Sequence, residues 1–409
     1  MNRIKQLILS IVFIFIFQSL AFGQGSTYGG TFVNSAPIAL NGVSNRTISG
    51  LSITNPGGHC ISLRNCSNIT VQNCKLGPSL NEGVYLYNCT NITVINNTMD
   101  TNDTGVVADG CTGGIKVTHN DVKNVQGPMP RGQMVQFGHV TGGGNSISYN
   151  VLDNVPNQSH PEDAISLFIT NGIAGDPIQV IGNWIRGGGP STSGGGIMTG
   201  DEGGSYVTVQ DNILVDPGQY GITISSGHHI IISNNTIYAK QQPFSNIGLS
   251  AYNQYPAEIT NSNTIMNNQV NYTNKSGVLN NLWNAGNAGV ITGWDTNTYN
   301  PNLSASILPV KIIGRAQSTV TAIVPIPINS SIKIYPNPAS DHLTIETTPD
   351  IDKGTIVIYN INGQKIIEQI VKESNTEIDT HNLTTGVYIV KVSNADKLIE
   401  EKKIIIRRN

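Results

Sequence analysis

The sequence predicts an all-β solenoid, in which short strands stack coil upon coil, and three observations lead to this fold class. Segments that alternate apolar and polar residues recur at intervals of 23 to 33 residues, a spacing typical of repeat architectures. A second strand-like segment precedes each of them at a nearly constant offset, and no helical periodicity is present. One column of the aligned segments is almost entirely asparagine: Cys74, Asn97, Asn120, Asn150, Asn183, Asn212, Asn235 and Asn268.

The flanking columns predict the register of the stack. Two residues past the asparagine column every side chain is apolar: Leu76, Met99, Val122, Leu152, Ile185, Leu214, Ile237 and Val270. We therefore expect this column to face the interior, with coils about 4.8 Å apart and each strand parallel to the one below. A second interior column is expected from Val94, Val117, Ile147, Val180, Val209 and Ile232. The asparagines themselves favour a structural role, because asparagine suits left-handed corners and can bond a stacked neighbour.

These repeats resemble a right-handed parallel β-helix, the single-stranded solenoid fold of pectate lyases and many carbohydrate-active proteins. The resemblance covers roughly residues 30–300, so we expect the β-helix to occupy residues 24–300. It implies the fold and leaves the activity open, because one fold supports many functions. The central stretch also resembles bacterial β-helix proteins with motifs such as RGQMVQF and PEDAIS, a likeness that names no reaction.

Both ends of the chain indicate export. Residues 1–23 contain Arg3 and Lys5, an apolar run and a small-residue cleavage site, which is the pattern of a secretory signal peptide. Residues 301–330 form a Pro/Ser/Ile-rich stretch that we interpret as a linker, and residues 331–409 alternate like the strands of a small antiparallel β-sandwich.

This last region resembles the C-terminal sorting domain of the type IX secretion system of Bacteroidota. The matching residues are Tyr335, Pro336, Asn337, Pro338, Gly363, Leu383, Gly386, Tyr388, Lys402 and Lys403. The resemblance implies interaction with the type IX secretion machinery and a protein that is secreted or attached to the outer-membrane surface.

The amino-acid composition argues against nucleic acid as a partner. The net charge of −3, with only 12% charged residues, excludes the strongly basic surface that nucleic-acid binding needs. Beyond the signal peptide no apolar stretch is long enough to span a membrane. We expect a monomer with a polysaccharide partner.

The cysteines also follow the repeat. Cys66, Cys89 and Cys111 share one column, which favours an interior stack of free thiols. A disulfide between coils remains an alternative in an exported protein.

The candidate site lies where the coils lengthen. Repeat proteins place insertions on their binding face, and the longest insertions here lead into Arg131, Gln133, His160, Glu162 and Asp163. The alternation predicts that Ile165 and Leu167 point inward, so that Ser166 points outward beside Gln136. We expect Asp201 and Glu202, another acidic pair, at a different corner, and hold them as reserve candidates.

A further outward column contains Asp100, Lys123, Asp153 and Arg186 on successive coils. One interpretation is a surface ladder of ion pairs. The other is the floor of a polar groove, in which Arg186 and Arg131 hold a substrate carboxylate. In that interpretation Gln133, Gln136, Lys123 and Asp153 also contact the substrate. Alternatively, Asp153, Glu162 and Asp163 could bind calcium, the one cofactor we consider.

These residue types suit reactions on acidic glycans. An arginine paired with a uronate carboxylate acidifies the adjacent C–H, and His160, Glu162 or Asp163 could then remove the proton, with Arg186 in the catalytic set. We therefore expect a polysaccharide lyase acting by β-elimination. The alternatives are a glycoside hydrolase that uses two carboxylates and a non-catalytic glycan-binding or adhesin solenoid. Trp283 and Trp294 fall where the last coil ends, which favours a capping role for both.

Overall fold

The structure is a computed structural model that describes residues 25–314, 333–347, 354–360, 365–371, 375–394 and 397–408. The chain divides into two compact units, Met1–Val320 and Thr321–Asn409, and each is described by itself. The signal peptide expected at residues 1–23 lies outside the described residues. No helix in the described ranges has the length and apolar character needed to cross a membrane.

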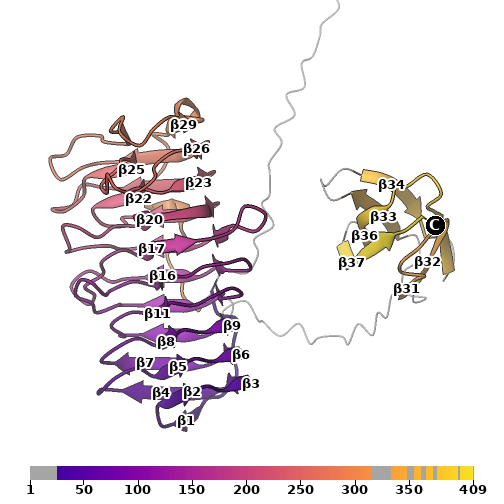
Figure 1. Ribbon diagram of the computed structural model, residues 1–409, viewed down its shortest axis with the longest axis horizontal. Coiled ribbons are helices and arrows are strands. Elements are labelled where there is room, and N and C mark those ends of the chain that lie inside the picture. The colour runs from indigo at the N-terminus through magenta and orange to yellow at the C-terminus, as the bar shows by residue number, and fades with distance from the viewer. Residues whose placement is uncertain are drawn as a thin grey trace, which may run out of the picture. The chain divides into compact units, whose positions relative to one another are not determined.

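The first unit is a parallel β-solenoid with three faces, A, B and C (Figure 1). Face A is an 11-stranded sheet made of β1 (Val33–Ser35), β4 (Leu51–Asn55), β7 (Lys75–Ser79), β10 (Thr98–Asp100), β13 (Asp121–Lys123), β16 (Val151–Asp153), β19 (Trp184–Arg186), β21 (Ile213–Val215), β24 (Thr236–Ala239), β27 (Gln269–Tyr272) and β30 (Thr298–Tyr299).

Faces B and C are two parallel ladders that share one long strand, β20 (Ile197–Gln210). Besides β20, face B contains β2 (Ile38–Asn41), β5 (Ile61–Arg64), β8 (Val84–Tyr87), β11 (Val106–Asp109), β14 (Val135–Gly138), β17 (Ile165–Asn171), β22 (Tyr220–Ile224), β25 (Ile247–Ala251) and β28 (Leu282–Asn284). Besides β20, face C contains β3 (Ser44–Ser49), β6 (Ser67–Gln72), β9 (Thr90–Ile95), β12 (Lys116–Thr118), β15 (Ser146–Ser148), β18 (Ile178–Ile181), β23 (His228–Ser233), β26 (Asn263–Met266) and β29 (Ile291–Thr292). The last coils also carry two short 3-10 helices, η1 (Trp294–Thr296) and η2 (Ala305–Ile307).

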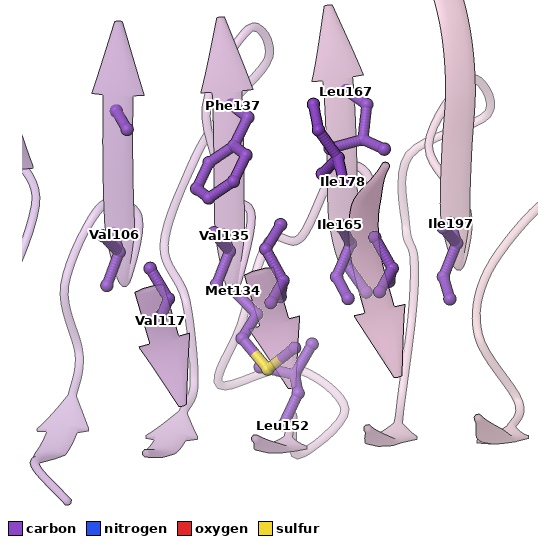
Figure 2. Packing of buried hydrophobic residues seen from close by; sticks show 14 of the residues in the cluster. Val106, Val117, Met134, Val135, Phe137, Leu152, Ile165, Leu167, Ile178 and Ile197 are labelled. Carbon is purple, nitrogen blue, oxygen red and sulfur yellow. The ribbon is translucent and has the colours of Figure 1, made fainter. Parts of the chain in front are cut away.

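The register predicted from the sequence is confirmed. Val94, Val117, Ile147, Val180, Val209 and Ile232 pair in one ladder of face C, and all are buried. Leu76, Met99, Val122, Leu152, Ile185, Leu214, Ile237 and Val270 do the same on face A. Figure 2 shows the corresponding row of face B, in which Val106, Val135, Ile165 and Ile197 stack from strand to strand. Burial of these aliphatic columns is the main stabilising term of the solenoid.

The asparagine column forms a buried ladder of hydrogen bonds. From Asn120 to Asn268, each Oδ1 accepts two bonds from the preceding coil, as Asn183 does from the backbone N–H and the Nδ2 of Asn150, at 3.0 and 3.1 Å. Its own Nδ2 donates to Ile147 O and to Asn212 Oδ1. The left-handed backbone that we expected in this column lies one residue earlier in most coils, for example at Asn96 with φ 61°. The column residue is therefore selected for its side-chain amide, and its neighbour supplies the corner.

Residues 301–314, which the sequence analysis assigned to a linker, pack on face A, and we call them the strap. Leu308 and Ile312 are buried against Val151 and Val215. At its end, Gly314 N–H donates to Asp121 Oδ2 at 2.8 Å, while Oδ1 of the same carboxylate accepts from Ser26 N–H. The strap therefore covers part of face A and leaves face B as the side where loops and polar groups surround a cavity.

The second unit contains two antiparallel sheets around one core. One sheet has the order β31 (Lys333–Tyr335), β32 (His342–Glu346) and β35 (Asn375–Asp379); the other has the order β34 (Lys365–Ile370), β33 (Thr355–Asn360), β36 (Gly386–Asn394) and β37 (Lys397–Ile406). Both sheets contribute buried aliphatic residues, such as Ile345 and Ile358, to a common cluster. This arrangement is the small antiparallel sandwich that the sequence predicted.

Candidate functional site

A cavity of about 600 Å³ lies over the outward side of face B. Its floor follows the paired outward residues Gln136, Ser166 and Met198 on β14, β17 and β20. The pairing of Gln136 with Ser166 is the one that the sequence predicted. The other lining residues come from strands β17, β20 and β22, from the loops that precede β14, β17, β20 and β22, and from the segment that follows β25: Met129, Pro130, Gln133, Glu162, Asp163, Phe168, Thr192, Ser193, Asp201, Gln219, Tyr220, Tyr252, Gln254 and Tyr255. The cavity therefore extends across five coils of one face.

Glu162 and Asp163 stand at the start of β17, at the wall of this cavity, and each is 8% exposed. Ser193 Oγ donates to Glu162 Oε1 at 2.6 Å. The glycine run that follows Ser193 makes this contact possible, because a Cβ on Gly194 would lie only 2.4 Å from the backbone of Glu162. The loop that contains Ser193 can therefore close directly onto the carboxylate.

Two hydrogen bonds to the Asp163 side chain end on the same carboxylate oxygen. Asp163 Oδ1 accepts a hydrogen bond from Gly195 N–H at 3.0 Å and another from the hydroxyl of Tyr220. Burial above all, together with the nearby charges of Glu162 and Asp201, raises the pKa of Asp163 to about 7, against the lowering effect of these two bonds. A carboxyl group with such a pKa is a general acid near neutral pH.

Asp201 lies in the same cavity, although the sequence analysis expected it at a separate corner. It pairs with Phe168 because the long strand β20 continues through Asp201, with a shifted register, before it joins face C. The hydroxyl of Tyr255 donates to Asp201 Oδ1 at 2.7 Å, and burial raises the pKa of Asp201. Its neighbour Glu202 is exposed and does not line the cavity.

Arg131 lies beside the cavity and is fixed between two side chains. Its Nε lies 3.1 Å from Glu82 Oε1, and its Nη1 donates to Gln136 Oε1 at 2.7 Å. His59 Nδ1 is 2.5 Å from the other Glu82 oxygen. Burial raises the pKa of Glu82, but the hydrogen bond from His59 and the charges of His59 and Arg131 outweigh it and leave the pKa lowered. Arg131 therefore supports the wall through Gln136.

Gln133, the other predicted substrate-binding residue from this loop, lines the cavity and is nearly buried. Its Oε1 accepts from Thr104 Oγ1 at 3.2 Å and its Nε2 donates to Pro130 O at 3.0 Å. These bonds use both ends of the amide, so that Gln133 holds the loop in place at the cavity wall.

The structure places Arg186 away from this cavity. Arg186 is on face A, where its Nε and Nη2 bond the two oxygens of Asp153 at 2.8 Å each. Its Nη1 donates to the strap carbonyls of Pro309 and Val310. Lys123 and Asp100 continue the same column, 3.9 Å apart and exposed. The column is therefore the ladder of ion pairs that formed one of the two interpretations, and the reason is geometric: Arg186 begins the loop that leads from face A to face B.

His160 and Asp153 also lie outside the lining of this cavity. His160 is exposed and lines a neighbouring cavity with Pro156, Gly189 and Phe244, so it is not placed with the carboxylates. Asp153 is bonded to Arg186 on face A and cannot share an ion with Glu162 and Asp163. Within the described residues, no three His, Cys, Asp or Glu side chains gather closely enough to hold a metal ion. The five cysteines, Cys60, Cys66, Cys74, Cys89 and Cys111, are free and buried, as the interior-stack interpretation expects.

Sequence reasoning missed the tyrosines. Tyr220 and Tyr255 each donate to a cavity carboxylate, and Tyr252 lines the wall beside them. Tyr220 stands within the segment DPGQYGI, which the sequence analysis did not use as a site. A usable signal does exist: Tyr220 stands two residues before the paired Ile222, in the same column as Asp163 before Ile165. Among the described lining residues there is no lysine, arginine or histidine.

Comparisons with known proteins agree with the architecture. Residues 333–407 match the family model of the secretion system C-terminal sorting domain, and residues 21–151 match that of the right handed beta helix region. An ulvan lyase of Nonlabens ulvanivorans is 33% identical over 78 residues, and a funoran endo-beta-hydrolase of Wenyingzhuangia aestuarii is 35% identical over 78 residues. Each match covers 19% of this chain, about the length of the sorting domain, and the chain spans only 14% and 11% of those relatives.

Solved structures are more distant. The catalytic domain of a GH87 alpha-1,3-glucanase in complex with nigerose has a TM-score of 0.46 at 13% identity, over 63% of this chain and 50% of that chain. A tailspike protein of E. coli bacteriophage HK620 in complex with a pentasaccharide has a TM-score of 0.35 at 10% identity, over 91% and 84%. The two family-model matches and the solenoid topology show that the chain joins a right-handed parallel β-helix to a secretion system C-terminal sorting domain. The sorting domain implies export by type IX secretion to the cell surface or the extracellular space.

Proposed function

We propose that the β-helix is a glycan-degrading enzyme and that its reaction is glycoside hydrolysis. The observation that carries the proposal is the convergence of Glu162, Asp163 and Asp201 in one cavity whose lining holds no cationic side chain among the described residues. Hydrolysis of a glycosidic bond needs two carboxyl groups, one as acid and one as base or nucleophile. Elimination from a uronate is favoured by a cation against the substrate carboxylate, and no lysine, arginine or histidine is among the described lining residues.

Asp163 is assigned the acid role. Its raised pKa keeps a proton on the carboxyl group near neutral pH, and that proton passes to the glycosidic oxygen as the bond to the anomeric carbon breaks. Glu162 is assigned the second role, acting on a water molecule or directly on the anomeric carbon. Ser193 orients Glu162 through its hydrogen bond to Oε1. Asp201 adds negative charge beside Asp163 and so favours the protonated acid.

The substrate class follows from the shape of the face. The lining runs from Gln136 on β14 to Tyr252 after β25, which is four coil steps, or about 19 Å at the usual strand spacing. A polymer lying along the stack would contact side chains from every coil, and tyrosine walls suit a ligand with apolar faces and many hydroxyl groups. The curated relatives act on ulvan and funoran by name; both are candidates here.

Elimination is the second candidate, because Arg131 stands one side chain away from the cavity and bonds its lining residue Gln136. A movement of Arg131 off Glu82 would bring a cation to the substrate. The two reactions leave different products, since elimination creates a double bond in the new non-reducing sugar and hydrolysis does not.

The test incubates the mature full-length chain with ulvan, funoran, polygalacturonate and a neutral glucan. New reducing ends and ultraviolet absorbance from double bonds are followed separately. The proposal expects reducing ends without the absorbance, and a loss of about 10²–10⁴-fold for Asp163→Asn and for Glu162→Gln. Asp295→Asn, at an exposed carboxylate on η1, is the matched control. Unsaturated products would instead support the lyase, and binding without either product would support an adhesin.

A further inference from the structure

We infer that Tyr252 and Trp283 form an aromatic subsite that binds a sugar ring of the same glycan chain, beyond the carboxylates toward the C-terminal coils. The inference rests on the proposed function, because it supplies the direction and the length of the bound chain. The occupant is one pyranose ring of a polymer, held against the two aromatic side chains.

The geometry of the pair is that of an open platform. The two rings have centroids 5.6 Å apart and planes tilted by 36°. Trp283 is 48% exposed, so much of its indole surface is in contact with water. It stands on β28, where it pairs with Ser250 of β25, in the outward column of face B. The platform therefore continues the face that forms the cavity floor.

Tyr252 connects this platform to the cavity. It is itself a lining residue, and its hydroxyl donates to Gln254 Oε1 at 3.1 Å, an oxygen that Ser225 Oγ also approaches at 3.1 Å. These bonds fix the tyrosine ring between the carboxylates on one side and Trp283 on the other. A chain that leaves the cavity along face B toward the C-terminal coils would therefore pass over Trp283.

The exposure of Trp283 has no structural explanation in the last coil. The sequence analysis expected both Trp283 and Trp294 to cap the solenoid, but only Trp294 packs against the main hydrophobic core. Trp184, the third tryptophan, packs with the cluster under the strap. Large aromatic surface left in water is costly, and it becomes favourable when a ligand covers it.

A pyranose ring suits this surface chemically. Its axial C–H bonds form an apolar face that can lie on an indole, while its equatorial hydroxyls stay in water or reach polar neighbours such as Gln254. From Asp163 on β17 to Trp283 on β28 there are four coil steps, or about 19 Å. Only a chain of several sugars can reach both, so the subsite should affect long substrates and leave short ones unchanged.

Native tryptophan fluorescence tests the inference directly. The probe is a size series, from disaccharides to decasaccharides, prepared from funoran and from ulvan, added to the full chain in the Asp163→Asn background to prevent cleavage. We expect the longer oligosaccharides to change the tryptophan emission and disaccharides to leave it unchanged. Trp283→Phe should remove the signal while calorimetry shows the affinity retained within a few-fold. Trp283→Ala should weaken binding of long chains about tenfold and of disaccharides not at all.

Tyr299→Ala is the matched control, because Tyr299 is also exposed but lies on face A; it should bind like the parent. Unchanged emission with every oligosaccharide, or equal affinity of Trp283→Ala and the parent for long chains, would overturn the subsite. The failure of the proposed function looks different. A Trp283-dependent signal without hydrolysis by the wild type would reject the hydrolase and keep the subsite. Hydrolysis whose rate depends neither on Trp283 nor on the length of the substrate would keep the hydrolase and reject the subsite.

Discussion

The hydroxyl of Tyr220 donates a hydrogen bond to Oδ1 of Asp163, although the two residues are 57 positions apart in the sequence. The stack explains this contact. Gly195 occupies the same column on the coil between them, and a Cβ there would lie 2.6 Å from the tyrosine ring. Because the middle coil has a glycine at this position, the ring of Tyr220 can reach the carboxyl group of Asp163. Residues from three successive coils therefore form the environment of this carboxyl group.

The contact predicts a shift in the pH profile. The bond from Tyr220 stabilises the charged form of Asp163 and lowers its pKa, so Tyr220→Phe should raise that pKa. A general acid is lost as the pH rises through its pKa, and the alkaline limb of kcat/KM should therefore move to higher pH in the variant. The measurement is kcat/KM against pH. Tyr272→Phe, which also loses a buried hydroxyl bond, to Gly218 O, should leave the limb in place. A limb that moves to lower pH in Tyr220→Phe would refute this assignment.

Arg186 should be a residue of stability and not of catalysis. It bonds both oxygens of Asp153 and two carbonyls of the strap, so Arg186→Met should lower the free energy of unfolding by about 1–3 kcal/mol. It should also expose residues 301–314 to limited proteolysis while turnover stays unchanged. Lys123→Met is the control from the same column, and its exposed 3.9 Å pair with Asp100 should contribute less than about 1 kcal/mol. Loss of turnover in Arg186→Met with a normal unfolding transition would return Arg186 to the catalytic set.

The asparagine ladder should be costly to interrupt in its middle. Asn183→Ala removes the acceptor of two bonds from Asn150 and the donor to Ile147 O, so that buried polar groups on the preceding coil lose their partners. On the following coil, Asn212 Oδ1 keeps only the bond from the backbone N–H of residue 183. Each such group costs about 1–3 kcal/mol, so denaturant unfolding should show a loss of several kcal/mol. Gln241→Ala removes an exposed amide bonded to Lys275 O and should change stability little. Equal costs for the two changes would mean that the ladder adds nothing beyond corner geometry.

Export should depend on the C-terminal unit. Deleting residues 331–409 removes the region that matches the sorting domain, so the truncated protein should accumulate in the periplasm of the producing bacterium. Cell fractionation with an antibody to the β-helix measures this. Delivery of the truncated chain to the surface at the level of the full chain would show that the domain is dispensable.

The fold could be predicted from the sequence because stacking requires the same alternation of buried and exposed side chains in every coil. The interior columns, such as the one through Val117 and Val180, needed only period-2 alternation and a constant offset. The site was harder, because neighbours on the stack must also share a face. Glu162 and Asp163 lead directly into a face B strand and line the cavity, whereas Arg186 ends a face A strand on the far side of a loop.

Asp201 shows the other limit of the pattern. It sits inside a 14-residue strand that crosses from face B to face C, with glycine at φ 68° just before it and at φ 93° soon after. Such bends change which way a side chain points without changing the repeat interval. The tyrosines were missed for a related reason, since a buried ring that bonds a carboxylate two coils away leaves no local motif.

The alkaline limb of the pH–rate profile tests most directly the central claim, that Asp163 is the general acid of a glycoside hydrolase. The full-length chain is incubated with whichever of ulvan, funoran, polygalacturonate or neutral glucan it cleaves, and the release of reducing ends is measured from acid to alkaline pH, in parallel with Asp163→Asn. The account predicts that the wild-type rate falls as the pH rises through about 7, where Asp163 loses its proton, and that the variant is slower by about 10²–10⁴-fold at the optimum. A variant that retains the wild-type rate and profile, or products that carry a new double bond, would contradict it.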